Sequence, residues 1–320
     1  MDAYRARRSC LAVPASSERF LAKARDLPAD EVFLDLEDAV APAAKEAARR
    51  NAVAALTSGP WRARVRAVRI NDATTPWAYR DVIDVAEGAP GDVDVIVLPK
   101  VTSPAHVAWL DLLLTQIEQA TAGRDRAPGP RPPGRRIGIE AQIEDARGLA
   151  AVDAIAAASG RLEALVFGPA DFMASVGMRS LEVGVQPPGY AGDAFGYALM
   201  RILVAARAHG LQAIDGPYLK IRDVDGFRRA AASAAALGYD GKWVLHPGQI
   251  DAANEVFAPG QAEYDRAEQI LDAYAHATTV DQRGAVMLGD EMIDEASRKM
   301  AAGLAAKGRA AGLKRTPDPA

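Results

Sequence analysis

The sequence predicts an α/β protein built as a (β/α)8 TIM barrel with a C-terminal helical extension. Eight short apolar runs rich in β-branched residues recur up to residue 245, with enough chain between them for helices. Ala-rich amphipathic segments fill most of these intervals. Alternating strands and helices imply parallel pairing, and eight such strands close into a barrel more readily than they form an open sheet. No Gly-x-Gly-x-x-Gly motif follows the first run, which counts against a dinucleotide-binding fold.

The expected elements follow in order along the chain. Strands are predicted at 10–13, 32–36, 67–70, 93–98, 137–143, 165–167, 212–214 and 243–245. Helices are predicted at 43–56, 104–120, 149–158, 197–209 and 224–237. The Pro/Gly-rich segment 123–134 is unsuited to a helix or a central strand, and the chain from about residue 259 carries helical signals without a strand. We therefore expect a catalytic barrel over 1–257 and a helical extension over 258–320.

Composition restricts the class of protein. The net charge of −4 and the scattered basic residues argue against a nucleic-acid partner. No uninterrupted apolar stretch reaches the length of about 18 residues that a membrane span needs. The single cysteine, Cys10, cannot form an internal disulfide, which favours a reducing compartment. These features predict a cytoplasmic enzyme.

Two carboxylates mark the expected active site. Glu144 and Asp171 each follow an apolar strand, and one βα unit separates them. Neighbouring parallel strands place both acids at the carboxyl-terminal face of a barrel, where active sites lie. The two carboxylates repel each other unless a proton or cation stands between them, and a hard divalent ion, Mg²⁺ or Mn²⁺, suits such oxygen ligands. The alternative is a pair of surface acids at strand ends.

Strand periodicity predicts which other polar groups face the barrel axis. Glu140, Gln142 and Glu144 share one face of the fifth strand, opposite its apolar residues. Arg69 faces inward on the third strand, and Asp35 and Glu37 share a face of the second. Buried charges of this kind must pair with one another, with a metal or with a ligand.

With these residues in place, the chain resembles the citrate lyase β-subunit-like, metal-dependent acyl-CoA lyases, and within them the malyl-CoA lyase branch. The matching motifs occur in the order of the family from about residue 8 to residue 300. They are Leu34-Asp-Leu-Glu-Asp-Ala-Val-Ala-Pro42, Val68-Arg-Ile-Asn71, Leu98-Pro-Lys-Val101, Ile143-Glu144 with Gly148, Gly168-Pro-Ala-Asp-Phe172, Asp215-Gly-Pro217, Gly241-Lys-Trp-Val-Leu-His-Pro-Gly-Gln249 and Met292-Ile-Asp294. Segment 180–193 looks shorter than in this branch, so we expect a difference in acyl preference there.

The resemblance implies a role for each residue of the site. Glu144 and Asp171 are expected to bind Mg²⁺, with Mn²⁺ as a substitute, and the metal to chelate glyoxylate. Arg69 is expected to hold the thioester oxygen and stabilise an enolate; the alternative is a salt bridge to Asp35 or Glu37. The expected supporting groups around the metal and Arg69 are Asp35, Glu37, Asp38 and Glu140. The expected contacts to substrate and CoA are Arg8, Arg19, Lys23, Arg69, Pro169 and Ala170.

The resemblance also implies a shared active site. Asp294, on the extension, is expected to enter the site of a neighbouring subunit and act as the general acid/base. This requires a homo-oligomer, with a trimer or hexamer expected. His246 precedes a proline at a strand end, where a structural hydrogen bond is a simpler role than catalysis.

The activity implied is reversible Claisen-type cleavage of malyl-CoA or β-methylmalyl-CoA to glyoxylate and acetyl-CoA or propionyl-CoA. Three alternatives stay open at this point. They are a malyl-CoA thioesterase or a lyase for another acyl-CoA, such as citramalyl-CoA; a class II 2-oxo acid aldolase; and a non-catalytic acyl-CoA-binding subunit. The intact Arg69, Glu144, Asp171 and Asp294 argue against the last of these.

Overall fold

The computed structural model describes residues 4–122 and 135–316. The chain divides into two compact units, one formed by Arg7–Phe257 and the other by Met1–Ala6 with Ala258–Ala320. The Pro/Gly-rich segment 123–134 lies outside the described residues. Within the described residues, no helix is both long and apolar enough to cross a membrane.

The larger unit is a closed barrel of eight parallel strands in sequential order, which confirms the predicted fold class. The strands are β1 (Ser9–Pro14), β2 (Glu31–Asp35), β3 (Val65–Arg69), β4 (Val95–Leu98), β5 (Gly138–Ile143), β6 (Leu162–Phe167), β7 (Gln212–Asp215) and β8 (Gly241–Val244). β8 pairs with β1 through Ser9, Cys10 and Leu11, which closes the barrel.

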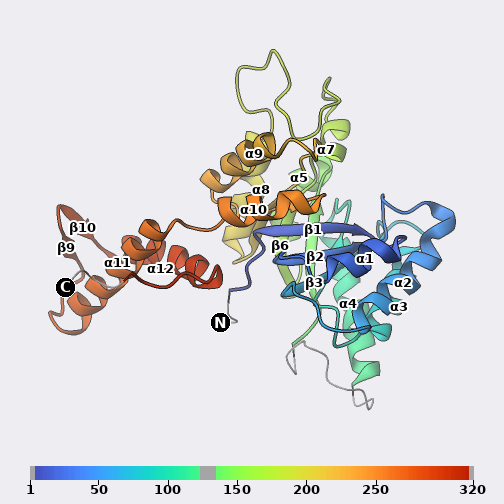
Figure 1. Ribbon diagram of the computed structural model, residues 1–320, viewed down its shortest axis with the longest axis horizontal. Coiled ribbons are helices and arrows are strands. Elements are labelled where there is room, and N and C mark those ends of the chain that lie inside the picture. Colours follow the sequence, from blue (N-terminus) through green and yellow to red (C-terminus); the bar gives the residue numbers. More distant parts are fainter. Residues whose placement is uncertain (1–3, 123–134, 317–320) are drawn as a thin grey trace. The chain divides into compact units, whose positions relative to one another are not determined.

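The helices lie outside the strands, as Figure 1 shows for α1 to α4. They are α1 (Glu18–Ala24), α2 (Lys45–Thr57), α3 (Ala78–Gly88), α4 (Pro104–Thr121), α5 (Ala146–Ala150), α6 (Val152–Ala156), α7 (Pro169–Ser175), α8 (Gly196–Ala208), α9 (Val224–Leu237) and α10 (Ile250–Val256). Short 3-10 turns, η1 (Pro42–Ala44) and η2 (Pro247–Gln249), precede α2 and α10. The single helix expected over 149–158 is two short helices, and α1, α3, α7 and α10 were not among the predicted helices.

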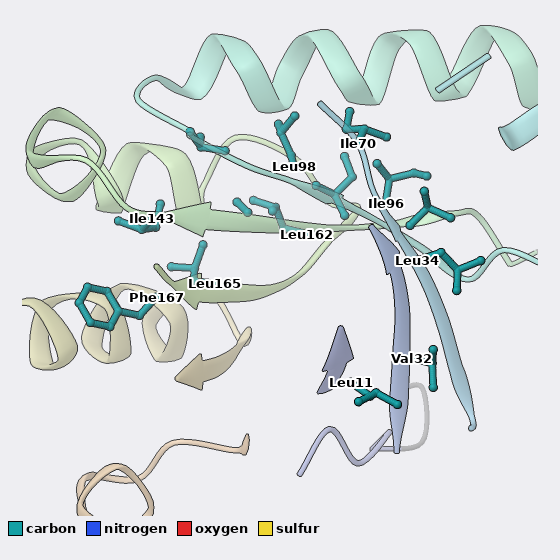
Figure 2. Close-up of a cluster of buried hydrophobic side chains, with 14 of the residues drawn as sticks. Leu11, Val32, Leu34, Ile70, Ile96, Leu98, Ile143, Leu162, Leu165 and Phe167 are labelled. Carbon is teal, nitrogen blue, oxygen red and sulfur yellow. The ribbon is translucent and has the colours of Figure 1, made fainter. Parts of the chain in front are cut away.

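Two apolar layers stabilise the barrel. Side chains on the outer faces of the strands pack beneath the helices, among them Leu34, Ile96 and Leu165 (Figure 2). A smaller cluster fills the barrel interior and includes Cys10, which is buried and not in a disulfide. The apolar residues of β5 belong to the outer layer, so its polar residues face inward, as the strand periodicity predicts.

The smaller unit consists of helix α11 (Gln261–Thr279), strands β9 (Val286–Leu288) and β10 (Glu291–Ile293), and helix α12 (Glu295–Ala310). The helices pack through Tyr264, Ala267, Ala301 and Ala305. The expectation of an extension without strands was wrong, because β9 and β10 form an antiparallel hairpin. Gly289, with φ of 64°, makes the tight turn between them.

Candidate active site

Arg69 ends β3 and is held in one orientation by two carboxylates from β2 and the turn after it. Its Nε and Nη2 donate to the two oxygens of Asp35 at 2.8 and 2.7 Å. Its Nη1 lies 2.9 Å from Glu37 Oε2, and the guanidinium stacks 5.3 Å from the Trp243 ring. Burial alone would lower the pKa of Arg69, but Asp35 and Glu37 more than offset it and the pKa is raised. Arg69 is therefore a fixed and permanent cation.

Glu144 follows β5 directly and is only 2% exposed. The backbone N–H of Lys100 donates to its Oε1 at 2.7 Å, and Gln142 Nε2 donates to its Oε2 at 2.6 Å. Burial, followed by repulsion from Glu37 and Asp171, raises the pKa of Glu144 well above its usual value. These two donors orient the carboxylate, while the surrounding charge disfavours its ionised form unless a cation is present.

Gly168 brings Asp171 close to Glu144. A Cβ at Gly168 would overlap Glu144 Oε2 and would lie 2.9 Å from Gln142 Nε2. The glycine thus allows the chain leaving β6 to pass against the carboxylate. Asp171 follows in the first turn of α7, partly exposed, and lines the same cavities as Glu144.

A cavity of about 400 Å³ opens at the carboxyl ends of the strands. It brings together the guanidinium of Arg69 and the carboxylates of Glu144 and Asp171. The other lining residues are Ala12, Pro14, Asp35, Asp38, Ala39, Gln142, Gly168, Pro169, Ala170, Pro217, Trp243 and Leu245. Glu144 and Asp171 also line a second cavity of about 380 Å³, on the side of Lys100 and His106. The two carboxylates therefore lie where the two cavities meet the same residues.

The charges around the cavity fit a divalent cation. Five carboxylates and three basic groups lie at or beside the cavity, which leaves an excess of two negative charges if all are ionised. The carboxylates are Asp35, Glu37, Asp38, Glu144 and Asp171, and the basic groups are Lys45, Arg69 and Lys100. Among the described residues, no three His, Cys, Asp or Glu side chains converge as a ready-made metal site. Mg²⁺ characteristically binds through one or two carboxylates and keeps several waters, so Glu144 and Asp171 suit it.

Most of the predicted site residues meet at this cavity. Asp35, Glu37, Asp38, Arg69, Glu144, Pro169, Ala170 and Asp171 lie at the cavity or contact its lining. The salt bridges to Asp35 and Glu37 that were expected as an alternative role for Arg69 are present. Each engages one hydrogen of a terminal guanidinium nitrogen, and the second hydrogen of that nitrogen can still be donated to a substrate. The pairing with Asp35 and Glu37 and a role toward substrate are therefore compatible.

Glu140 does not support this site. It is fully buried near the amino ends of the strands, where its Oε1 lies 2.7 Å from Arg7 Nε. Arg7 also pairs with Glu31 and Glu163, which begin or nearly begin β2 and β6. The expectation that Glu140 supports the metal ligands is corrected, because it belongs to a separate ionic cluster around Arg7.

Arg8 also lies away from the cavity. It precedes β1 and therefore stands at the amino end of the barrel, where its Nε and Nη2 donate to Asp30 at 2.7 and 2.8 Å. Its expected contact with CoA at the carboxyl face is corrected for this reason. Arg19 and Lys23 are exposed on α1, which follows β1, so they remain candidates.

Asp294 caps α12 in the smaller unit. Its Oδ1 accepts from the Ser297 N–H at 3.0 Å, and this bond lowers the pKa of the carboxyl group. A carboxyl group with a lowered pKa is ionised at neutral pH. His246 Nδ1 accepts from the Gly248 N–H at 3.1 Å, the local structural role expected for it.

The sequence analysis assigned no role in the site to three residues: Lys100, Gln142 and Trp243. Gln142 was predicted to face inward with Glu144, but its hydrogen bond to that carboxylate was not. Trp243 lies in the quoted motif after residue 241, which gave no sign that its ring packs against Arg69. Lys100 lies in the Leu-Pro-Lys-Val motif, but nothing in the sequence indicated its backbone conformation.

The barrel and this constellation of residues define the class of protein. Residues 8–247 match the HpcH/HpaI aldolase/citrate lyase family, and the chain belongs to this family. The predicted family and its assignment to the carbon–carbon lyases are thereby confirmed.

Individual relatives agree with this assignment. The chain is 39% identical to the L-malyl-CoA/β-methylmalyl-CoA lyase of Rhodobacter capsulatus over 297 residues, 90% of each protein. It is 34% identical to the (3S)-malyl-CoA thioesterase of Cereibacter sphaeroides over 282 residues, 88% of each. The structure of CitE from Mycobacterium tuberculosis in complex with magnesium, acetoacetate and coenzyme A is 30% identical, with a TM-score of 0.70, covering 96% of this chain and 99% of that one.

Proposed function

We propose that this protein is a Mg²⁺-dependent lyase that reversibly cleaves a β-hydroxyacyl-CoA, with malyl-CoA or β-methylmalyl-CoA as substrate. The products are glyoxylate and acetyl-CoA or propionyl-CoA. The observation that carries the proposal is the single cavity in which a fixed guanidinium, Arg69, faces two carboxylates suited to a divalent ion, Glu144 and Asp171. The similarity to a named malyl-CoA/β-methylmalyl-CoA lyase supplies the substrate class.

Cleavage in this direction removes the proton of the β-hydroxyl group and breaks the bond between the hydroxyl carbon and the carbon next to the thioester. The electrons of that bond form an enolate whose negative charge lies on the thioester oxygen. Arg69, with a hydrogen left on each terminal nitrogen, can donate to this oxygen. When bound between Glu144 and Asp171, Mg²⁺ would supply a Lewis acid for the oxygen of the 2-oxo acid.

The remaining roles are proposed for residues outside the cavity. Arg19 and Lys23 are candidates for binding the negatively charged part of CoA because they are exposed on the helix that follows β1. Asp294 is proposed to exchange the proton in the site of a neighbouring subunit, in a homo-oligomer that is a trimer or hexamer. The buried free Cys10 supports a reducing location, the cytoplasm.

A second candidate is the hydrolysis of malyl-CoA at the same site, which is favoured by the similarity to a (3S)-malyl-CoA thioesterase. Hydrolysis breaks the thioester and releases free CoA and malate. Cleavage by the lyase leaves the thioester intact. The identity of the CoA product therefore distinguishes the two reactions directly.

The test is to incubate the purified protein with malyl-CoA, β-methylmalyl-CoA and citramalyl-CoA, with Mg²⁺ or with EDTA, and to identify the CoA species and the 2-oxo acid by mass spectrometry. We expect acetyl-CoA or propionyl-CoA with glyoxylate from the first two substrates, in Mg²⁺ only. Free CoA without glyoxylate would establish the thioesterase. Absence of any turnover of the three thioesters would refute the proposed function.

A further inference from the structure

Lys100 has a backbone conformation that is rare for a residue with a side chain. Its φ is 52°, in the left-handed region, and among the described residues only Gln282 shares this property without being glycine. Such a conformation is costly and persists where the surrounding structure imposes it, often at functional sites. Lys100 follows β4 and lines the second cavity beside Glu144 and Asp171.

The neighbouring chain holds Lys100 in this conformation. The N–H of Val101 donates to the carbonyl of Gln142 at 3.2 Å, which ties the loop after β4 to β5. Gly148 approaches the carbonyl of Val101 so closely that a Cβ there would overlap it. Contacts with β5 and with Gly148 therefore fix the loop, and they hold Lys100 in the left-handed conformation.

This conformation allows one residue to contact two separate parts of the site. The backbone N–H points to Glu144 Oε1 at 2.7 Å. The side chain turns to the segment after β2, where Nζ donates to Glu37 Oε1 at 2.6 Å and to Asp38 Oδ1 at 3.2 Å. Glu37 in turn lies 2.9 Å from Arg69 Nη1. Lys100 thus connects the proposed metal ligand with the carboxylate that positions the guanidinium.

We infer that Lys100 is a positioning residue with two separable actions: its left-handed backbone N–H orients Glu144 for the metal, and its ammonium group holds Glu37 in place beside Arg69. The inference rests on the proposed function, because it assigns these actions to the same site. It predicts that changes of backbone conformation affect metal binding, whereas loss of the ammonium group affects turnover.

Two substitutions separate the actions. Glycine adopts the left-handed conformation without strain, so Lys100→Gly keeps the N–H in place and removes the side chain with its ammonium group. Valine strongly disfavours this conformation, so Lys100→Val removes both. Loss of an outer partner of a metal ligand typically weakens metal affinity or activity by about 10–100-fold. We therefore expect the dissociation constant for Mn²⁺, measured by electron paramagnetic resonance, to rise by about that factor in Lys100→Val and to stay near the wild-type value in Lys100→Gly.

Turnover should follow the other pattern. Lys100→Gly should lower kcat about tenfold or more, the effect of losing a hydrogen bond to a charged group, with little change in KM. Lys100→Arg keeps a cation that can reach the same carboxylates and should restore most of kcat. Gln282→Val and Gln282→Gly are matched controls for the effect on stability of changing a residue with left-handed backbone. Neither should change the affinity for Mn²⁺.

Thermal melting identifies variants that fail to fold, and Lys100→Ala, a milder disturbance of the backbone, then replaces Lys100→Val. Equal Mn²⁺ affinity in folded glycine and valine (or alanine) variants would overturn the backbone action. Unchanged kcat in Lys100→Gly would overturn the side-chain action. If the wild-type protein itself neither binds Mn²⁺ nor turns over a thioester, the proposed function fails, which is a separate outcome.

Discussion

Replacing Arg69 by lysine should lower kcat by about 10²–10³-fold, the typical cost of losing one donor to an oxyanion. In the native site the guanidinium spans both oxygens of Asp35, at 2.8 and 2.7 Å, and lies 2.9 Å from Glu37. A lysine ammonium keeps the charge but lacks the planar fork, so it cannot satisfy these carboxylates and also direct a hydrogen at the substrate.

Stability must be separated from catalysis in this experiment. Asp35 is only 2% exposed, and removing the partner of a buried charge typically costs about 3–5 kcal/mol. Arg69→Met alone should therefore destabilise the barrel. Adding Asp35→Asn removes the stranded charge, so the double variant should recover much of the free energy of unfolding and remain inactive.

The assay is the initial rate of glyoxylate release at saturating malyl-CoA, with urea unfolding of each variant measured in parallel. Wild-type kcat in the folded double variant would refute a role for Arg69 at the thioester oxygen. A loss of rate in Arg69→Lys that matches its unfolded fraction would equally show that the residue serves only the fold.

Three further changes test other parts of the account. Arg19→Ala with Lys23→Ala should raise KM for the acyl-CoA with little change in kcat, because these charges would bind ground state and transition state alike; steady-state kinetics measures both. Asp294→Asn should lower kcat about 10²–10⁴-fold with Mg²⁺ binding intact, since asparagine caps a helix as well as aspartate does. Glu140→Gln should make the melting temperature fall less steeply as pH rises. The reason is that burial, followed by repulsion from Glu140, raises the pKa of Glu31 in the folded protein. The stability that this shift contributes is complete below the unfolded pKa of about 4.3 and is lost as pH rises through the folded pKa.

Each of these changes has a control or a contradicting result. Arg8→Ala, which loses the pairing with Asp30 at the amino end of the barrel, should leave KM unchanged; an equal KM in the Arg19 and Lys23 variant would place the CoA site elsewhere. Mixing subunits that carry Asp294→Asn with inactive Glu144→Gln subunits should restore part of the activity if the site is shared. No restoration after verified exchange would contradict the shared site. A melting temperature for Glu140→Gln that depends on pH as in the wild type would contradict the contribution of Glu140 to the raised pKa of Glu31.

The sequence predicted the barrel and the residues at its mouth because both depend on simple repeats. Alternation of strands and helices placed Glu144 and Asp171 at the same face, and the two-residue period turned Gln142 and Glu144 inward. Periodicity does not show, however, how far along the strand an inward residue lies from the carboxyl end. Each strand residue advances about 3.3 Å, so Glu140 lies roughly 13 Å before Glu144 and meets Arg7 instead.

Other features depend on tertiary packing that local patterns do not contain. The left-handed backbone of Lys100 arises from contacts with Gln142 and the close approach of Gly148, which are distant in sequence. The location of Arg8 could have been deduced from the sequence, because a residue that precedes a strand of a parallel barrel lies at its amino end. The hairpin at Gly289 also had a sequence signal, a two-residue Gly-Asp turn between short apolar runs.

The central claim is that Glu144 and Asp171 bind a divalent ion that cleavage requires. The most direct measurement is malyl-CoA cleavage by protein stripped of metal with EDTA, dialysed and then titrated with Mg²⁺, beside Glu144→Gln and Asp171→Asn treated identically. The account predicts no cleavage by the stripped wild type, full recovery on titration, and no recovery by either folded variant. Undiminished activity in the metal-free protein, or wild-type recovery by either variant, would contradict it.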